Sequence, residues 1–317
     1  MERLHLSDCA PLDEAILLNL GNLENLTHLR AYIQFQDSAE STAGLLDFKH
    51  GFQKLIKLDV HCQPTHLVRF MLASSMPQLS VLELRLRPHF ADAFHSDFSS
   101  ICRHIGPHNL TRFRVELGDF LHPPRHLMDV LEPLLPFANL QELEVLSETH
   151  LPLRNEDLER LARAWPKLHA LILAQSETTM TEPDRIPGSV ERPTLHGLVA
   201  LAQGCPRLAQ ISIPDLDATS VPPTDSVPLI AHRARNLCIQ NLVGAEEDER
   251  QLAIAVVLDR LFPRLRLEPW GIEELPGHGG NPNMYLADSK NVSLLLRAMQ
   301  LARKHYRDPG GIQLPNA

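Results

Sequence analysis

A short apolar phrase returns along the chain, and this repetition constrains the fold more than any other feature. Each phrase has an apolar marker residue, followed by further apolar residues three and five positions later. Clear copies start at Leu79, Leu110, Leu140, Leu168 and Leu208. All the markers together lie near residues 1, 26, 55, 79, 110, 140, 168, 208, 234 and 265. Because these positions are roughly 24 to 40 residues apart, we expect about ten irregular repeats.

Each repeat is predicted to contain one strand and one helix. Within a phrase, apolar and polar residues alternate, which is the period of a half-buried strand. Between phrases the apolar spacing becomes helical, as in Leu158, Leu161, Ala162 and Trp165, and again in Leu198, Leu201, Ala202 and Cys205. Prolines that end a helix just before the next marker are Pro77, Pro166, Pro206 and Pro263. The order strand, helix, strand predicts a parallel sheet with right-handed crossovers.

Three segments carry a resemblance to a known family. Asn155–Leu171 and Leu198–Leu208 resemble leucine-rich repeats, and more narrowly the ribonuclease-inhibitor-like array of F-box leucine-rich-repeat proteins. Ala253–Leu265 is similar to the last helix and strand of many fungal members. The resemblance spans roughly residues 1–270 and is strongest from 140 to 265. It implies an α/β fold, a right-handed leucine-rich-repeat solenoid (horseshoe) with parallel strands on its concave face and helices on its convex face.

The resemblance also implies a function. We expect a non-enzymatic scaffold for protein partners, resembling the substrate-recognition part of a cullin ubiquitin ligase receptor. An F-box adaptor would bind only if an F-box lies upstream, because no F-box-like segment is found and Leu151–Pro152 is interpreted as a loop. Met1–Leu6 begins inside a strand phrase, which predicts a C-terminal portion of a longer protein or a truncated gene product.

Composition excludes several classes of partner. The net charge of −9, with 30 basic residues, argues against nucleic acid or an anionic membrane as the main partner. The chain has no run of 18 apolar residues and no signal layout, so we expect a soluble protein of the cytoplasm or nucleus. The cysteines are expected to be reduced and mostly buried, and they are Cys9, Cys62, Cys102, Cys205 and Cys238.

Catalytic and metal chemistry is not expected from this sequence. His61, Cys62 and His66 lie close together, as do Cys102, His104 and His108, but neither group has the spacing of a zinc site. There is no Gly-x-Ser-x-Gly motif, and the glycines of 277–282 lack the lysine of a phosphate loop. We therefore predict no enzyme, no cofactor and no metal. The alternatives are a regulator of another enzyme such as a GTPase, acting through Arg185 or Arg192, or a fragment with no partner.

Two rows of side chains are predicted to leave the core and cross the exposed face of the sheet. The first row is Arg3, His28, Lys57, Val81, Arg112, Glu142, Ala170, Gln210 and Asn236. The second is His5, Arg30, Asp59, Glu83, Arg114, Glu144, Ile172, Ser212 and Cys238. Neighbouring strands place Arg30 beside Asp59, Arg114 beside Glu83 and Glu144, and Arg112 beside Glu142.

These rows support two interpretations. The charges either satisfy one another on a solvated face or bind a partner. The cations predicted to be in unpaired excess, which would favour an acidic partner segment, are Arg3, His5, His28, Arg30 and Lys57. Arg112, Arg114, Leu146 and Ile172 complete the predicted partner-binding set.

Apolar positions and long loops follow the charged part of the sheet. Leu146, Ala170, Ile172 and Ala174 are predicted to face out, where the insertion Gln175–Pro193 covers them or leaves a binding site. A second, proline-rich insertion spans Pro214–Pro228.

The chain is predicted to close with a helix. The expected divisions are a solenoid over residues 1–268, a connecting loop over 269–288, a capping helix over 289–307 and a disordered tail over 308–317. Ser289 is the predicted N-cap, and the apolar side of the helix carries Val292, Leu295, Leu296, Met299 and Ala302. A partner-binding amphipathic helix is the alternative to a cap.

Overall fold

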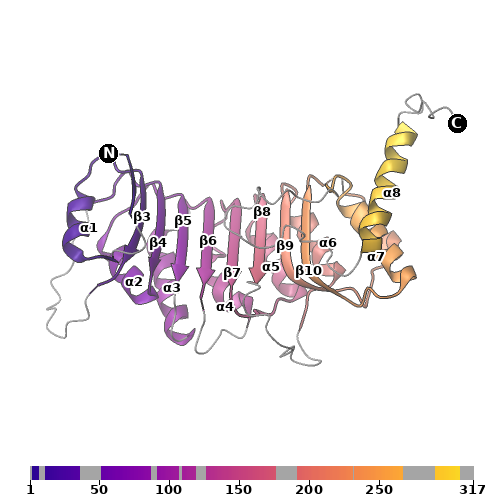
Figure 1. Ribbon diagram of the computed structural model, residues 1–317, viewed down its shortest axis with the longest axis horizontal. Coiled ribbons are helices and arrows are strands. Elements are labelled where there is room, and N and C mark those ends of the chain that lie inside the picture. The colour runs from indigo at the N-terminus through magenta and orange to yellow at the C-terminus, as the bar shows by residue number, and fades with distance from the viewer. Residues whose placement is uncertain are drawn as a thin grey trace. The chain divides into compact units, whose positions relative to one another are not determined.

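The protein is an α/β protein in which parallel strands alternate with helices (Figure 1). The computed structural model describes residues 2–6, 11–35, 51–86, 91–106, 109–118, 126–175, 191–230, 232–266 and 290–307. Ten strands lie in this part of the chain, and each recorded strand pairing is parallel. The predicted alternation of strand and helix is therefore confirmed.

The strands coincide with the predicted phrases. They are β1 (Arg3–His5), β2 (Pro11–Leu12), β3 (His28–Ile33), β4 (Lys57–Cys62), β5 (Val81–Leu86), β6 (Arg112–Leu117), β7 (Glu142–Ser147), β8 (Ala170–Gln175), β9 (Gln210–Asp217) and β10 (Asn236–Val243). Only β2 was not predicted; it adds two residues beside the end of β3. The tenth predicted phrase, at Leu265, forms no strand within the described residues, which stop at 266 in this region.

The helices follow the strands in sequence. They are α1 (Glu14–Gly21), α2 (Pro64–Ala73), α3 (Ala91–Ile105), α4 (Leu127–Leu131), α5 (Asn155–Ala164), α6 (Leu195–Gly204), α7 (Asp248–Leu261) and α8 (Lys290–Arg307). Short 3₁₀ turns are η1 (Glu132–Leu134) and η3 (Thr224–Ser226).

The chain divides into two compact units. Unit 1 contains Met1–Leu153 and Arg163–Val190, and unit 2 contains Arg154–Ala162 and Glu191–Ala317. In unit 1 the strands lie in the order β1-β3-β4-β5-β6-β7-β8, with β2 beside β3. In unit 2, β9 pairs with β10. The single array predicted for residues 1–268 stays a prediction.

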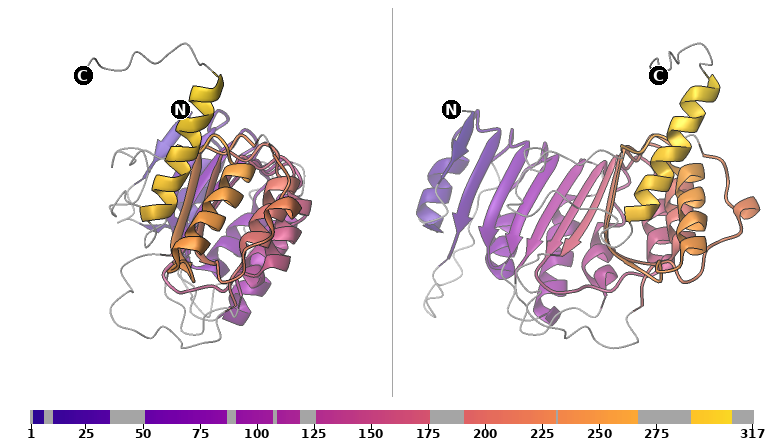
Figure 2. Two further views of the ribbon diagram at one scale, coloured as in Figure 1. Left: turned by 90° about the vertical axis from the view of Figure 1, so that its right-hand side faces the viewer. Right: turned by 45° about the vertical axis from the view of Figure 1, so that its right-hand side comes forward.

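One face of the unit 1 sheet is buried, and most side chains of the other are partly exposed. In β3, Leu29, Ala31 and Ile33 are buried whereas the residues between them are partly exposed, and β5 repeats this alternation. Helices α2, α3 and α4 lie along the same side of the strands (Figures 1 and 2). The buried side chains therefore form a core between the strands and this helix layer, as the period of two predicts.

A common turn leads into the strands. The marker leucine donates its backbone N–H to the carbonyl three residues earlier, as in Leu79 to Met76 at 3.1 Å and Leu168 to Trp165 at 3.1 Å. Leu55 and Leu140 make the same bond without a proline in the turn. The described markers are buried in both units, so the repeats that make this bond start with the same anchor.

Polar side chains start several helices. Asp13 accepts the N–H of Ile16 at 2.9 Å before α1, and Thr194 accepts the N–H of His196 at 3.2 Å before α6. Pro64 occupies the first turn of α2, where its missing N–H costs nothing. These caps satisfy donors that a helix leaves free at its N-terminus.

Within unit 2, α5 and α6 approach very closely. A Cβ atom at Gly204 would lie 2.6 Å from the Cβ of Ala162, and one at Gly197 would lie 2.6 Å from Oδ1 of Asn155. Oδ1 of Asn155 also accepts the backbone N–H of Thr194 at 2.8 Å. The two helices are thus joined at their N-termini by a hydrogen bond and along their length by small residues.

Helix α8 packs on α7 in unit 2. Val292 and Leu296 are buried, and Arg303 lies 2.6 Å from Asp259 Oδ1 and 3.2 Å from the Pro263 carbonyl. Gln300 donates to the carbonyl of Leu265 at 2.9 Å. The predicted cap, Ser289, and the predicted loop and tail on either side of this helix lie outside the described residues.

Candidate protein-binding surface

The face of the unit 1 sheet opposite the helix layer carries three rows of side chains, and we call it the open face. The first predicted row is in register from Arg3 through His28, Lys57, Val81, Arg112 and Glu142 to Ala170. The second predicted row runs from His5 through Arg30, Asp59, Glu83, Arg114 and Glu144 to Ile172. A third row, of which only Leu146 and Ala174 were predicted to face out, contains Tyr32, His61, Arg85, Glu116, Leu146 and Ala174.

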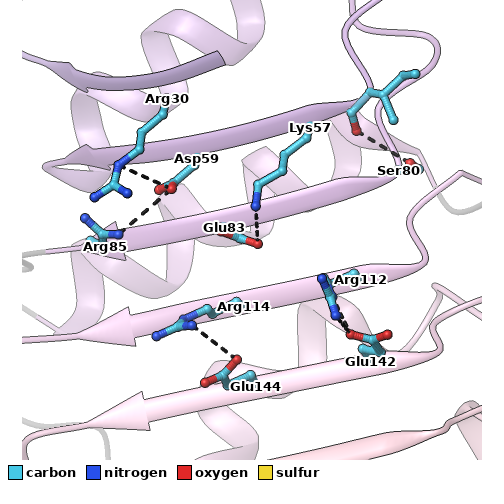
Figure 3. Close-up of polar contacts among 11 residues, drawn as sticks. Arg30, Lys57, Asp59, Ser80, Glu83, Arg85, Arg112, Arg114, Glu142 and Glu144 are labelled. Carbon is cyan, nitrogen blue, oxygen red and sulfur yellow. Dashed lines mark hydrogen bonds and ion pairs between the residues drawn. The ribbon is translucent and has the colours of Figure 1, made fainter. Parts of the chain in front are cut away.

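Three of the predicted ion pairs join adjacent strands of the open face (Figure 3). Arg30 Nε lies 3.6 Å from Asp59 Oδ2, and an Arg114 terminal nitrogen lies 3.5 Å from Glu144 Oε2. Arg112 pairs with Glu142. Many of these charged side chains therefore pair with one another across neighbouring strands, which is the first of the two interpretations given above.

Lys57 corrects the sequence-based prediction of an unpaired cation. Its Nζ lies 2.7 Å from Glu83 Oε1 on the next strand (Figure 3). The prediction paired Glu83 with Arg114, which faces it directly across the ladder, but no such bond is formed among the described contacts. Lys57 reaches Glu83 because its long side chain can extend diagonally along the sheet. Arg30, also counted in the excess, is the partner of Asp59.

Asp59 is the most buried charged group of the open face. Only 6% of the residue is exposed, and it lies between Arg30 and Arg85, the latter at 3.9 Å. Burial raises the pKa of Asp59, and the two guanidinium groups partly offset this effect. Arg85 also lies 3.7 Å from Glu116. Arg85, from the third row, thus links the predicted pairs into a network. The sequence signal for this row was the apolar–polar alternation, which continues two residues further along each strand.

The end of the open face at β1, β3 and β4 keeps positive charge. Arg3 and His5 are exposed, and His28 is half-buried. Burial lowers the pKa of His28, and the nearby cations Arg3, Lys57 and His5 lower it further, whereas Glu2 acts in the opposite direction. We call Arg3, His5, His28 and Lys57 the basic end of the open face.

The apolar end of the open face is less open than predicted. Leu146, predicted to face out, is only 7% exposed, because its side chain is covered within the fold. Ile172, Ala170 and Ala174 are half-buried. Most of the insertion predicted to cover them, residues 176–190, lies outside the described residues, so covering by that loop stays a prediction.

The sequence also offered Arg185 and Arg192 as residues that could act on another enzyme. Arg192 lies 3.9 Å from Asp215, and Arg185 is outside the described residues.

Cys62, Cys102 and Cys205 are buried thiols, and burial raises the pKa of Cys205 to about 12. Cys238 is half-buried beside Ser212 in unit 2, and burial raises its pKa to about 11. Thiols with such raised pKa values are poor nucleophiles.

Among the described residues, no three or more His, Cys, Asp or Glu side chains converge as metal ligands would. Nδ1 of His66, from the first histidine–cysteine group, instead accepts the backbone N–H of Phe35 at 3.3 Å. Nε2 of His104, from the second, lies 3.0 Å from the carbonyl of Ser74. Over the same part of the chain, none of the helices combines the length and the apolar character needed to cross a membrane.

Comparison with known proteins leaves the open face as the main guide to function. No protein-family model matches the chain, and no curated protein matches it. The fold itself places the chain among α/β proteins built from strand–helix repeats.

Proposed function

We propose that this chain is a non-enzymatic scaffold that binds a protein partner on the open face of unit 1. The observation that carries the proposal is the open face itself: a helix layer covers one side of the sheet, while the other presents three rows of side chains in register. Such a face gives a partner an ordered set of charged positions to contact.

The scaffold is proposed to be a right-handed leucine-rich-repeat solenoid with its strands on the concave side. Recurring strand–helix units, the turn shared by most markers and the buried marker leucines support this proposal. By the resemblance of Asn155–Leu171 and Leu198–Leu208 to F-box leucine-rich-repeat proteins, the partner would be a substrate for a cullin ubiquitin ligase.

The surface is tested with matched charge reversals. Arg30→Glu with Lys57→Glu changes the open face, whereas Lys54→Glu with Arg103→Glu changes exposed cations elsewhere in unit 1. Partner proteins captured by the wild-type chain are quantified for both variants by mass spectrometry. We expect at least a fivefold loss for the open-face variant only, because the reversed charges repel a partner that the native face attracts. Equal capture by both variants would mean that the open face is not the site.

The ligase assignment is tested separately. The chain is purified from cells with and without any coding sequence that precedes it in the gene. Recovery of an F-box adaptor with the longer form supports the assignment. If neither form recovers an F-box adaptor while the open face still captures its partner, the scaffold proposal stands and the ligase assignment is wrong.

A further inference from the structure

His28 lies in the first row of the open face, between a cation on each of the two adjacent strands. Across the ladder it faces Arg3 on β1 and Lys57 on β4. Because adjacent strands are about 4.8 Å apart, an anionic group above His28 would lie within reach of all three side chains.

The contacts of the Thr27 hydroxyl bear on which ring nitrogen of neutral His28 carries the proton. The Thr27 hydroxyl donates its only proton to the carbonyl of Glu2, at 2.8 Å. It also lies 2.9 Å from Nδ1 of His28, where it accepts a hydrogen bond if Nδ1 is protonated and donates one if Nδ1 is not. Donation of the hydroxyl proton to Glu2 favours the tautomer in which neutral His28 carries its proton on Nδ1 and leaves Nε2 unprotonated. Within the described part of the chain, no hydrogen bond to Nε2 is formed.

From this tautomer, protonation of His28 creates a new donor without breaking an existing bond. The added proton goes to Nε2, while Nδ1–H keeps its bond to Thr27. The unbound protein disfavours this proton, because the ring is partly buried and lies among cations. An anion at Nε2 would reverse that balance.

The charged groups facing His28 can be assigned strand by strand. From β1 and the residue before it come Arg3, His5 and Glu2, and β3 itself contributes Arg30. From β4 come Lys57, which is paired with Glu83, and Asp59, which is paired with Arg30 and Arg85. Arg3, His5 and His28 therefore supply the attraction for an anion that the ion pairs do not already use.

We propose that the basic end of the open face binds a carboxylate-rich segment of the partner, and that His28 takes up a proton at Nε2 as this segment binds. The inference rests on the proposed scaffold function and names the chemistry of its partner. Each glutamate of such a segment stays ionised at pH values where a histidine titrates. Capture is therefore coupled to pH through the protein and not through the ligand.

The probe is an oligoglutamate peptide, with an oligoglutamine peptide of equal length as its control. Binding to the full chain is measured by fluorescence anisotropy at pH 6.0 and 7.5. We expect oligoglutamate to bind roughly threefold to tenfold more tightly at pH 6.0, since one linked proton can change the affinity by at most tenfold per pH unit. Absence of oligoglutamate binding at both pH values would overturn the inference.

Matched histidine variants locate the proton. His28→Gln should bind oligoglutamate with a much smaller pH dependence, whereas His169→Gln, an exposed histidine elsewhere in unit 1, should behave as wild type. Urea midpoints establish that both variants are folded. An unchanged pH dependence in a folded His28→Gln variant would contradict the assignment to His28.

Long-range ¹H–¹⁵N spectra of the imidazole rings supply a readout that does not depend on affinity. The ¹⁵N shifts should identify neutral His28 as the Nδ1–H tautomer, and its pKa should rise when oligoglutamate is added. An Nε2–H tautomer, or a pKa that does not move at saturation, would refute the coupling. If the open-face charge reversals abolish capture of the natural partner while oligoglutamate does not bind, the scaffold stands and this inference fails.

Discussion

Lys57 on β4 reaches along the open face to Glu83 on β5, with its Nζ 2.7 Å from Glu83 Oε1. Lys57 faces Val81 directly across the ladder, and Glu83 lies two residues further along β5. The ion pair is therefore diagonal, and it draws one cation of the basic end toward the middle of the sheet.

Releasing Lys57 should strengthen binding of an acidic ligand. Glu83→Gln removes the charge that pairs with Lys57. We expect oligoglutamate to bind about twofold to fivefold more tightly, because a single partly exposed ion pair contributes little free energy. The gain should shrink at about 1 M salt, where the screening length is about 3 Å. Glu132→Gln, an exposed site in η1, is the control. A gain of equal size in the control would mean that net charge alone is responsible.

Protonation of His232 should destabilise unit 2. This side chain is 1% exposed, with Nε2 2.8 Å from the Cys205 carbonyl and Nδ1 accepting the N–H of Ala234 at 3.0 Å. A proton on Nδ1 would break the second bond. Burial lowers the pKa of His232 below its ordinary value of 6.5, and the bond to Cys205 only partly offsets this effect. As the pH falls below about 6.5, the unfolded chain takes up a proton that the folded chain resists, so stability falls.

The measurement for His232 is urea unfolding of wild type and His232→Asn at pH 7.5 and 5.5. Asparagine can keep the acceptor for Ala234 but cannot titrate, so the variant should lose less stability on acidification. At pH 7.5 it should be less stable by about 1 to 3 kcal/mol, because the Cys205 carbonyl loses its donor. The same loss on acidification in both proteins would assign the effect to other groups.

A methyl group at Gly204 should separate α6 from α5. Its Cβ would lie 2.6 Å from the Cβ of Ala162 and 3.2 Å from that residue's carbonyl carbon and oxygen. Backbone atoms cannot move aside without shifting a helix, so Gly204→Ala should cost about 1 to 3 kcal/mol in the free energy of unfolding. Gln203→Ala, at the exposed neighbouring position, should be nearly neutral. Equal stability of the two variants in chemical unfolding would exclude a tight contact here.

Arg303 should hold the second half of α8 against α7. Arg303→Met removes the bonds to Asp259 and the Pro263 carbonyl while retaining an apolar stem. Burial raises the pKa of Asp259 and Arg303 partly offsets it, so the variant leaves a half-buried carboxyl without its cation. We expect amide hydrogen exchange in α8 to accelerate by about fivefold to tenfold, corresponding to roughly 1 kcal/mol. Arg297→Met, at an exposed position of the same helix, should exchange as wild type.

The open face was predictable in its layout but not in its contacts. The alternation within each phrase placed Arg30, Asp59 and Glu144 in one row, because successive residues of a strand point to opposite faces. It could not choose between Lys57 and Arg114 as the partner of Glu83, since both lie close enough to reach. That choice depends on side-chain conformation, which the pattern does not contain.

The sequence by itself determined the strand–helix alternation, the parallel pairing and the register of the first two rows. These follow from short-range periods and from the marker leucine, whose burial and turn recur in most of the described repeats. Only the tertiary structure decided that Leu146 is covered, that Arg85 joins Asp59 to Glu116, and that the Thr27 hydroxyl lies between the Glu2 carbonyl and Nδ1 of His28. Each of these depends on atoms brought together from different strands, and such distances arise only when the whole sheet has formed.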